Sequence, residues 1–296
     1  MTSQRHILLS GGTGYIGGRV ARALLEHGDH IYFIIRPESN LKRCLQNNSN
    51  ITYINTDSSD EEALNLMSVQ PPDAFVHLAT YYRHDLTNLN YRNFLDSNIN
   101  MPTRWLVLSL QAGCQTIVNT ASYWQESDQP PHAATNLYAS TKASFESIIA
   151  GFVQSQALRA ITLRLFDVYG PDDPRPKIFG LVRNAIINNQ CLDLTPGRQL
   201  HHFTHINDVV DGYMHLLSNL EKYLPIQHYK FDLAGPRASL REAVAIYVDL
   251  FGETPTLNWG ALPYNSGQIH TPRLTNPLPG WFSKYELKQG LQTLVD

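Results

Sequence analysis

A glycine-rich turn near the N-terminus, in the stretch RHILLSGGTGYIGG from Arg5 to Gly18, constrains the fold more than any other feature of this chain. The residues before it, Ile7 to Leu9, are apolar and predict a short buried strand. The residues after it, Tyr15 to His27, carry apolar side chains at helical spacing, and Gly28 follows as a stop signal. The stretch therefore predicts a strand, a tight turn and a helix in direct succession.

Glycines of this turn stand where a dinucleotide-binding fold leaves no room for a side chain: in the turn, at the approach to the pyrophosphate, and where the helix packs on the strand. The N–H groups at the helix start would hold the phosphates. The alternative is an ordinary loop that happens to be rich in glycine. We predict a nucleotide site with contacts from Gly11, Thr13, Gly14, Tyr15, Ile16 and Gly17.

Length and composition indicate an ordinary globular protein. The 296 residues, of which 43% are hydrophobic, can bury a sizeable core. A net charge of -3 gives no basic field for nucleic acid, and no apolar run reaches the length of a membrane span. Cys44, Cys114 and Cys191 are isolated, which favours reduced thiols over disulfides or a metal site. We therefore expect a cytoplasmic protein that binds no metal, nucleic acid or membrane.

The residue after the second predicted strand, Ile31 to Ile35, points to the choice of cofactor. An NAD-binding unit usually places a carboxylate at the end of this strand to hold the ribose hydroxyls, whereas a cation accommodates the extra phosphate of NADP. Here the acidic position is Ile35 and the next residue is Arg36. An arginine fork can bind a phosphate, so we predict NADP(H). The alternative is a solvated loop arginine.

Two further strands bring polar residues to the same edge of the sheet. Ile51 to Ile54 is followed by Asp57 and Ser58, which are placed to reach the adenine, although Asp57 could equally cap the next helix. Ala74 to Leu78 runs into a polar loop, and loops after strand ends line the ligand crevice. We expect cofactor contacts from Leu78, Ala79 and Thr80, substrate contacts from Tyr82 and Arg83, and a packed core position for His77.

The candidate catalytic groups follow the fifth strand, Thr116 to Asn119. Thr120 comes next, and Tyr138 and Lys142 lie further on at the head of a predicted helix. A tyrosine and a lysine four positions apart share one helical face. An adjacent ammonium and an oxidised nicotinamide both stabilise the phenolate, so we expect a lowered pKa that makes Tyr138 a general acid or base. Lys142 can also bind the nicotinamide ribose, and Thr120 can hold the substrate oxygen.

The rest of the chain predicts a second, smaller unit. From Phe166 onward proline and loop residues become frequent, so we expect residues 1–165 to form the NADP-binding domain and residues 166–296 mainly a substrate-binding lobe. One helix, 205–220, has a buried face that returns it to the first domain. The remaining predicted elements are helix 98–111, strand 159–165, strand 229–233, helix 240–251 and a loop-rich segment, 255–281.

Together these motifs resemble an extended short-chain dehydrogenase/reductase of the NAD-dependent epimerase/dehydratase family, the branch that acts on nucleotide-linked sugars. The resemblance runs nearly end to end. Within the branch it is nearest to the 4-ketoreductases that finish deoxysugars, of the CDP-abequose synthase type. It rests on GGTGYIG, HLAT at 77–80, the strand end with Thr120, YASTK at 138–142, LRLFDVYGP at 163–171, HHFTHINDVVDGY at 201–213 and PGWFSKYELKQGL at 279–291.

The resemblance implies a Rossmann fold, here a doubly wound parallel sheet with a smaller C-terminal lobe, and the catalytic set Thr120, Tyr138 and Lys142. Dehydratases of this branch carry an Asp-Glu pair directly after the threonine, where this chain has Ala121 and Ser122. Neither can do acid or base work, so dehydration is not expected. Hydride and proton transfer remain.

Three positions depart from the branch. An arginine that commonly binds the nucleotide diphosphate is His201, a second is Asn265, and the usual asparagine before VYGP is Asp167. The diphosphate would then be held by other groups, such as Arg198 or Arg273, or the substrate is not a typical nucleotide sugar. Tyr123 and Trp124 are expected to be pocket walls. The substrate-binding set is therefore Tyr82, Arg83, Tyr123, Trp124, Asp167, His201 and Arg273.

The sequence as a whole predicts a reductase that delivers hydride from NADPH to the 4-keto group of a nucleotide-linked 6-deoxysugar. The alternatives are an epimerase of the same family with tightly bound NAD, and a non-catalytic NADP-binding sensor. The resemblance also implies a homodimer formed through helices near 98–112 and 138–155. The apolar residues expected there are Phe145, Ile148, Ile149 and Phe152.

Overall fold

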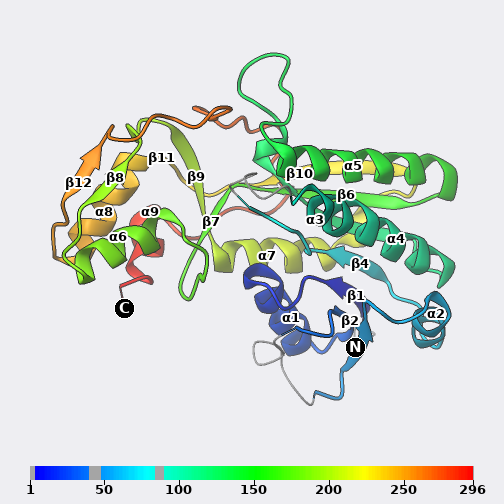
Figure 1. Ribbon diagram of the computed structural model, residues 1–296. Helices are drawn as coiled ribbons and strands as arrows, with labels where there is room; N and C mark the ends of the chain where they lie inside the picture. The colour runs from blue at the N-terminus through cyan, green and yellow to red at the C-terminus, as the bar shows by residue number, and fades with distance from the viewer. Residues whose placement is uncertain (1–3, 40–47, 84–89, 296) are drawn as a thin grey trace.

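A parallel sheet of seven strands forms the centre of the larger lobe of the protein (Figure 1). The structure is a computed structural model and describes residues 4–39, 48–83 and 90–295. The strand order is β10-β6-β5-β4-β1-β2-β3. The order reverses beside β1, which has β2 on one side and β4 on the other, so the ligand crevice of such a sheet opens at their carboxyl ends. The strands are β1 (His6–Ser10), β2 (His30–Ile35), β3 (Ile51–Asn55), β4 (Ala74–His77), β5 (Thr116–Ser122), β6 (Arg159–Leu165) and β10 (Gln227–Leu233).

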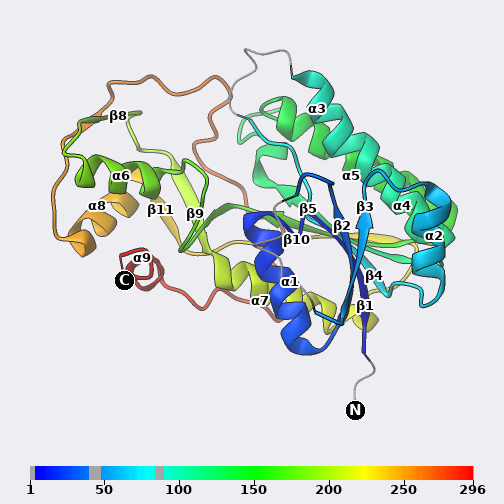
Figure 2. The same cartoon turned by 60° about the horizontal axis from the view of Figure 1, so that its bottom comes forward.

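Helices cover both faces of this sheet. On one face lie α1 (Tyr15–His27) and α7 (Ile206–Leu217), which pack side by side and come to the front in Figure 2. The other face is covered by α2 (Asp60–Ser68), α4 (Met101–Gln111) and α5 (Leu137–Gln156), with α3 (Tyr91–Leu95) and the π-helical turn η2 (Asp96–Asn100) leading into α4. The predicted doubly wound parallel sheet is therefore confirmed.

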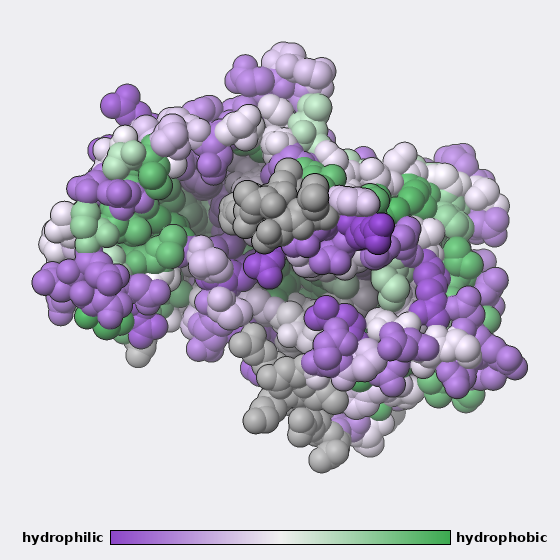
Figure 3. Space-filling view, in the orientation of Figure 1, coloured by the Kyte–Doolittle hydropathy of each residue, from purple (hydrophilic) through white to green (hydrophobic). Residues whose placement is uncertain are grey.

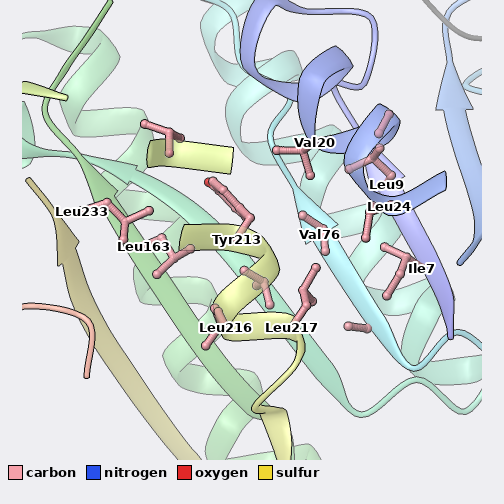
Figure 4. Packing of buried hydrophobic residues seen from close by; sticks show 14 of the residues in the cluster. Ile7, Leu9, Val20, Leu24, Val76, Leu163, Tyr213, Leu216, Leu217 and Leu233 are labelled. Atoms are coloured by element: carbon pink, nitrogen blue, oxygen red, sulfur yellow. The ribbon is translucent and has the colours of Figure 1, made fainter. Parts of the chain in front are cut away.

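The alternation of side chains along the strands divides the core into two apolar layers. Leu9 on β1 packs with Val20 and Leu24 of α1, and Figure 4 shows the same layer continuing to Tyr213 and Leu217 of α7. The neighbouring residue of Leu9 on the strand, Leu8, instead packs into the layer under α2, α4 and α5. Because both sheet faces are covered, the strands read as nearly continuous apolar runs.

The smaller lobe is built on two short sheets and three helices. Antiparallel and parallel pairs join β11, β9 and β7, and β12 pairs with β8. Their aromatic and aliphatic side chains form a separate core around Phe179, Phe203 and Tyr247. The elements are β7 (Asp167–Tyr169), α6 (Ile178–Ile187), β8 (Leu192–Leu194), β9 (Leu200–His205), β11 (Arg237–Ser239), α8 (Leu240–Phe251), β12 (Leu257–Trp259) and α9 (Leu287–Gln292), and a short turn η4 (Leu220–Lys222) follows α7.

The chain after Phe166 crosses between the two lobes more often than the sequence predicts. The expected return of helix 205–220 is found as α7, but β10 also returns, as the edge strand of the large sheet beside β6. The proline-containing stretch after Phe166 holds β7 and α6, and the expected loop 255–281 begins with β12. Short three-residue strands carry too little periodicity to be recognised in a sequence.

Candidate active site

The glycine turn lies where β1 and β4 end, at the reversal of strand order. Gly11 has φ +77°, and a Cβ on it would collide with the backbone amide of Ala79. A Cβ on Gly17 would collide with the carbonyl of Gly11. Gly14 stands at the start of α1, where a Cβ would come within 3.2 Å of the same carbonyl. Two of the three glycines are thus required by close backbone approach, and the third leaves the helix start uncovered.

The first turn of α1 is open to an anion. Gly14 provides no side-chain cap, and the turn contains no acidic residue. Thr13 and Ile16 are partly exposed, whereas the Tyr15 ring is buried and its hydroxyl donates to the carbonyl of Pro171 at 3.1 Å. Tyr15 therefore also ties the nucleotide turn to the start of the smaller lobe.

The residues predicted to bind the adenine end of the cofactor follow strands β2 and β3. Arg36 follows β2 with an exposed side chain, and its Nε lies 3.3 Å from a carboxylate oxygen of Glu38. Asp57 is exposed, and the cap of α2 is Ser59, whose side chain accepts from the amide of Glu62. The alternative of a helix-capping Asp57 is therefore wrong. Ser58 lies just before that cap, with its carbonyl bound by Arg104.

Asn98, which sequence reasoning did not single out, connects three parts of the site. It lies in the π-helical turn η2, where its carbonyl oxygen accepts from the Thr80 hydroxyl (3.1 Å) and the Tyr81 amide (2.7 Å). Its amide donates to the Tyr81 carbonyl and to the Thr141 hydroxyl, both at 3.0 Å. Asn98 thereby fixes the loop after β4 against α5. A π-turn often marks a functional site and Asn98 is fully buried, but neither property can be read from the sequence.

Tyr138 and Lys142 lie on the inner face of the first turns of α5, which Asn136 caps through its bond to the Ala139 amide. Lys142 is 5% exposed, and burial lowers its pKa to about 8, against an opposing effect of Glu146. Burial raises the pKa of Tyr138, although the neighbouring hydroxyls of Thr80 and Ser122 and the charge of Arg175 lower it. The expected lowering of the Tyr138 pKa is therefore wrong for the protein alone, because desolvation outweighs its neighbours.

The hydroxyl beside Tyr138 is Ser122 rather than Thr120. Strand β5 continues through Ser122 in register with β6, so Thr120 lies inside the sheet instead of at its end. Its hydroxyl lies 2.6 Å from the phenol oxygen of Tyr213 on α7 and donates to the His77 carbonyl, also at 2.6 Å. Ser122, two residues on and on the same strand face, accepts from the Trp124 amide at 3.3 Å and lies close enough to Tyr138 to lower its pKa. The Thr120 hydroxyl is thus engaged by His77 and Tyr213, and Ser122 is the strand hydroxyl that affects Tyr138.

Aromatic side chains gather near Tyr138. The Tyr82 ring lies 5.0 Å from that of Tyr138 and 6.0 Å from that of Trp124. Tyr123, in the turn η3 (Tyr123–Gln125), stacks on Phe166 with centroids 5.4 Å apart. Figure 3 shows a hollow between the two lobes, with hydrophilic residues around its rim. Tyr82, Tyr123 and Trp124 thus gather as expected, and Arg83 is exposed.

The two most unusual residues of the site pair with each other. His201 Nδ1 lies 2.7 Å from Asp167 Oδ2, joining β9 to β7. Burial raises the pKa of Asp167, but His201, Lys177 and a hydrogen bond from Tyr123 outweigh it and hold the pKa below its ordinary value. Asp167 is therefore not an unpaired group facing the substrate, because His201, Lys177 and Tyr123 all lie beside it inside the protein.

The pairing of Asp167 with His201 makes the stability of the fold depend on pH. A carboxyl whose folded pKa is lowered contributes stability above its unfolded value, here 3.8, and loses it as pH falls through the folded value. In His201→Gln, Asp167 has lost its main partner, so the effect of burial on the Asp167 pKa dominates. We expect that variant to be less stable than the parent by about 1 kcal/mol near neutral pH, discounted for partial exposure. Urea unfolding at several pH values should show the gap narrowing below about pH 4; a constant gap would contradict the assignment.

The segment 263–278, which we call the strap, crosses from the smaller lobe to the larger one (Figure 1). Ile269 of the strap is buried against Tyr123 and Phe166, so the strap closes the aromatic wall. Arg273 is exposed, and its carbonyl accepts from Arg164 at 3.1 Å. Asn265 is exposed as well, and Arg198 donates its amide to the Tyr264 hydroxyl.

Two kinds of site are not found among the described residues. Across residues 4–39, 48–83 and 90–295, no three histidine, cysteine or acidic side chains cluster in a way that could hold a metal. In the same part of the chain no helix has both the length and the apolar character needed to cross a bilayer. Cys44 lies outside the described residues, while Cys114 is buried and Cys191 is exposed, both as free thiols.

Comparison with protein families matches residues 7–230 to the NAD dependent epimerase/dehydratase family. The chain belongs to this family. Among curated relatives, CDP-abequose synthase of Salmonella typhimurium is 24% identical over 99% of this chain and 98% of that protein. The CDP-abequose synthase of Yersinia pseudotuberculosis is 26% identical over 75% of this chain and 80% of that protein. The dTDP-D-glucose 4,6-dehydratase of Mus musculus is 23% identical over 99% and 88%.

Solved structures agree on the fold of the epimerase/dehydratase family. UDP-glucuronic acid 4-epimerase from Bacillus cereus, in complex with UDP-glucuronic acid and NAD, superposes with a TM-score of 0.83 at 20% identity, over 98% of both chains. UDP-glucose 4-epimerase of Thermus thermophilus, in complex with NAD, gives 0.79 at 18% identity. The family membership expected from the sequence is therefore confirmed. Because the family is nicotinamide-dependent, a nicotinamide dinucleotide is the cofactor to test.

Proposed function

We propose that this chain is an NADPH-dependent reductase that transfers a hydride to the 4-keto group of a nucleotide-linked 6-deoxysugar. The observation that carries the proposal is the meeting of Tyr138, Ser122 and Lys142 beside an open glycine turn. No carboxylate follows either strand hydroxyl: Thr120 precedes Ala121, and Ser122 precedes Tyr123 and Trp124. Redox chemistry is therefore supported, and dehydration is not.

A dinucleotide fits the crevice. The turn after β1 has no room for side chains at Gly11 and Gly17, and the first turn of α1 presents free N–H groups with no acidic neighbour. Leu78 and Ala79 abut the turn, and Thr80 lies next to Tyr138. When bound, a reduced nicotinamide supplies the hydride. Residues 1–165 with α7 and β10 would then hold the cofactor, and most of residues 166–296 the substrate.

The remaining chemistry belongs to side chains of this chain. Tyr138 delivers a proton to the carbonyl oxygen as it becomes an alkoxide, and Ser122 donates a hydrogen bond to the same oxygen. A phenol kept protonated by burial is in the form that reduction requires. Lys142 binds the cofactor ribose and, when the site is filled, stabilises the phenolate that Tyr138 leaves behind.

Support for the substrate comes from the aromatic wall and the relatives. Tyr82, Trp124, Tyr123 and Phe166 offer apolar surface suited to the methyl group of a 6-deoxysugar. The full-length relatives named CDP-abequose synthase favour a nucleotide-linked sugar. Asp167 and His201 are paired to each other, so other groups must bind the diphosphate. Two cations lie nearby: Lys177 is close enough to Asp167 to lower its pKa, and Arg175 is close enough to Tyr138 to affect its pKa.

The test is to incubate the purified protein with NADPH and a panel of nucleotide-linked 4-keto-6-deoxysugars, following NADPH fluorescence. We expect NADPH to be oxidised only when a keto sugar is present, with one new hydroxyl at C4 of the product. An epimerase is the second candidate, favoured by the NAD-bound epimerases that share the fold. Tightly bound NAD with no net consumption would establish it, and NADPH binding without turnover would indicate the sensor.

Arg36 gives a prediction on cofactor choice. Its exposed pair with Glu38 is worth little, so the guanidinium is free to bind a 2′-phosphate. Arg36→Ala should weaken NADPH binding about tenfold and leave NADH binding unchanged. Glu38→Gln, which removes the competing anion, should tighten NADPH binding. The exposed Arg22 of α1 provides the control substitution Arg22→Ala. Equal affinities of the parent protein for NADH and NADPH would contradict the choice of NADPH.

A second prediction distinguishes the roles of the Thr120 and Ser122 hydroxyls. Ser122→Ala removes the hydrogen bond to Tyr138 and should lower kcat by about tenfold to a hundredfold with little loss of stability. Thr120→Val leaves Tyr213 with a buried unpaired hydroxyl, so it should cost about 1–3 kcal/mol of stability. Its kcat should stay near that of the parent. Steady-state kinetics and urea unfolding of both variants distinguish the two positions, and the reverse pattern would restore Thr120.

A homodimer remains part of the proposal, with a changed surface. Phe145 and Ile149 are buried in the chain's own core under α5, so the expected use of these two residues between subunits is wrong. Ile148 and Phe152 stay partly exposed on the same helix and could contribute. Sedimentation of the parent protein tests the oligomeric state directly.

A further inference from the structure

The proposed active site is divided between two elements, and one chain of side chains joins them. The end of β5 carries Ser122, while α5 carries Tyr138 and Lys142. The Ser122 amide donates to Oε1 of Gln125 at 2.9 Å. Gln125 Nε2 in turn donates to Oε2 of Glu146 on α5 at 3.0 Å. Gln125 is therefore a direct bridge between the strand end and the helix.

Glu146 lies on the catalytic face of α5, one turn after Lys142 and two after Tyr138. It is a buried carboxylate, 9% exposed, and such a group requires partners. One oxygen accepts from Gln125, and the other pairs with Lys230 of β10, whose side chain is 62% exposed. The carboxylate is thus held between the turn after β5, the helix and the edge strand.

The position of Glu146 also matters for charge. Its field opposes the burial that lowers the pKa of Lys142. Among the described residues, Glu146 from the same helix and His77 from β4 act on or are acted on by Lys142, and burial and Lys142 lower the pKa of His77. Tyr138 lies one helical turn before Lys142. Lys230 and His228 of β10 face Glu146 from the other side, and Gln125 is its neutral partner. Glu146 is therefore the anion, among these groups, that favours the charged form of Lys142.

We infer that Gln125 and Glu146 are positioning residues of the proposed active site. Gln125 fixes the Ser122 hydroxyl relative to Tyr138, and Glu146, held by Gln125 and Lys230, places a carboxylate one helical turn from Lys142. The inference rests on the proposed function for its kinetic consequences. The geometric link can be measured without any turnover.

Gln125→Met tests the bridge, since methionine has a similar length and forms no bridge of this kind. We expect kcat to fall about tenfold while the Kd for NADPH stays the same, because a small displacement of Ser122 affects only the reacting centre. The phenol of Tyr138, followed by carbon-13 tyrosine NMR, should titrate at higher pH than in the parent. Gln129→Met, an exposed glutamine in the same loop, is the matched control and should change neither quantity.

Glu146→Gln tests the charge, since the amide oxygen can still accept from Gln125. We expect Lys142 to titrate at lower pH in carbon-13 lysine NMR, its resonance being identified by its loss in Lys142→Met. Because Lys142 would then lose its charge at a lower pH, NADPH binding should begin to weaken at a lower pH in this variant than in the parent. Lys230→Gln, which removes the exposed partner of Glu146, is the control and should leave Lys142 close to its titration in the parent. Thermal unfolding of all variants checks that each is folded.

The outcomes separate this inference from the proposed function. If Lys142 titrates alike in Glu146→Gln and the parent, or Tyr138 titrates alike in Gln125→Met and the parent, the corresponding positioning role is wrong. If the parent oxidises no NADPH with any keto sugar, the proposed function fails. The two titrations then still decide whether Gln125 and Glu146 set the properties of Ser122, Tyr138 and Lys142.

Discussion

Tyr138→Phe is expected to lower the turnover of the keto sugar by about a hundredfold to ten-thousandfold, the usual contribution of a positioned general acid. The phenol of Tyr138 is the acidic group, and the neighbouring hydroxyls of Ser122 and Thr80 affect its pKa. Thr80 follows Ala79, which abuts the glycine turn. Phenylalanine keeps the ring and its edge contact with Tyr82, so the wall of the pocket should survive. Single-turnover measurements with saturating NADPH would report the loss in the chemical step.

The same variant should bind NADPH with the affinity of the parent, because the glycine turn and Lys142 are unchanged. Tyr229→Phe is a suitable control, since that tyrosine lies on β10 with its hydroxyl bonded to the Leu224 amide. It should retain parental turnover. Tyr138→Phe activity within a fewfold of the parent would mean that another group supplies the proton, and the assignment of the site would then be wrong.

The sequence predicts the larger lobe well because its signals are local. A buried parallel strand is a short apolar run, and each run from β1 to β6 is visible in the chain. The glycine turn can be predicted for the same reason, since the backbone contact between Gly11 and Gly17 needs no knowledge of distant residues. The smaller lobe lacks such signals, because β7, β8, β11 and β12 are three residues each and depend on partners far along the chain.

The error at Thr120 arises because sequence does not say how far a strand extends. Taking β5 to end at Asn119 makes Thr120 the first residue beyond the sheet. Pairing with β6 instead continues to Ser122, and the alternation of strand side chains brings Ser122 to the place expected for Thr120. The pairing of Asp167 with His201 was hidden similarly, since it joins strands 34 positions apart.

A buried arginine, Arg164, holds the strap that completes the substrate pocket. It is 8% exposed at the end of β6 and binds both oxygens of Asp232, at 2.6 and 2.9 Å. It also bonds Glu126, the Thr275 hydroxyl and the carbonyl of Arg273. Asp232 accepts in addition from the backbone amides of the strap at 275 and 276. Breaking this network affects both the core and the pocket.

Arg164→Met should therefore lower the free energy of unfolding by about 3–5 kcal/mol, because it leaves Asp232 as a buried carboxylate without its cation. The KM for the sugar nucleotide should rise as well, since the strap carries Ile269 onto Tyr123 and Phe166. Chemical denaturation and steady-state kinetics measure the two effects.

A second ion pair separates stability from pocket shape. Arg5 binds the buried Asp29 at the amino ends of β1 and β2, at 2.6 and 2.8 Å, whereas the ligand crevice opens at the carboxyl ends. Arg5→Met should also destabilise the protein, but its KM should remain parental. In the double variant Arg164→Met with Asp232→Asn, no buried charge is left unpaired and the amide oxygen can still accept from the strap. Most of the lost stability should return, and if it does not, desolvation of Asp232 is not the cause of the loss.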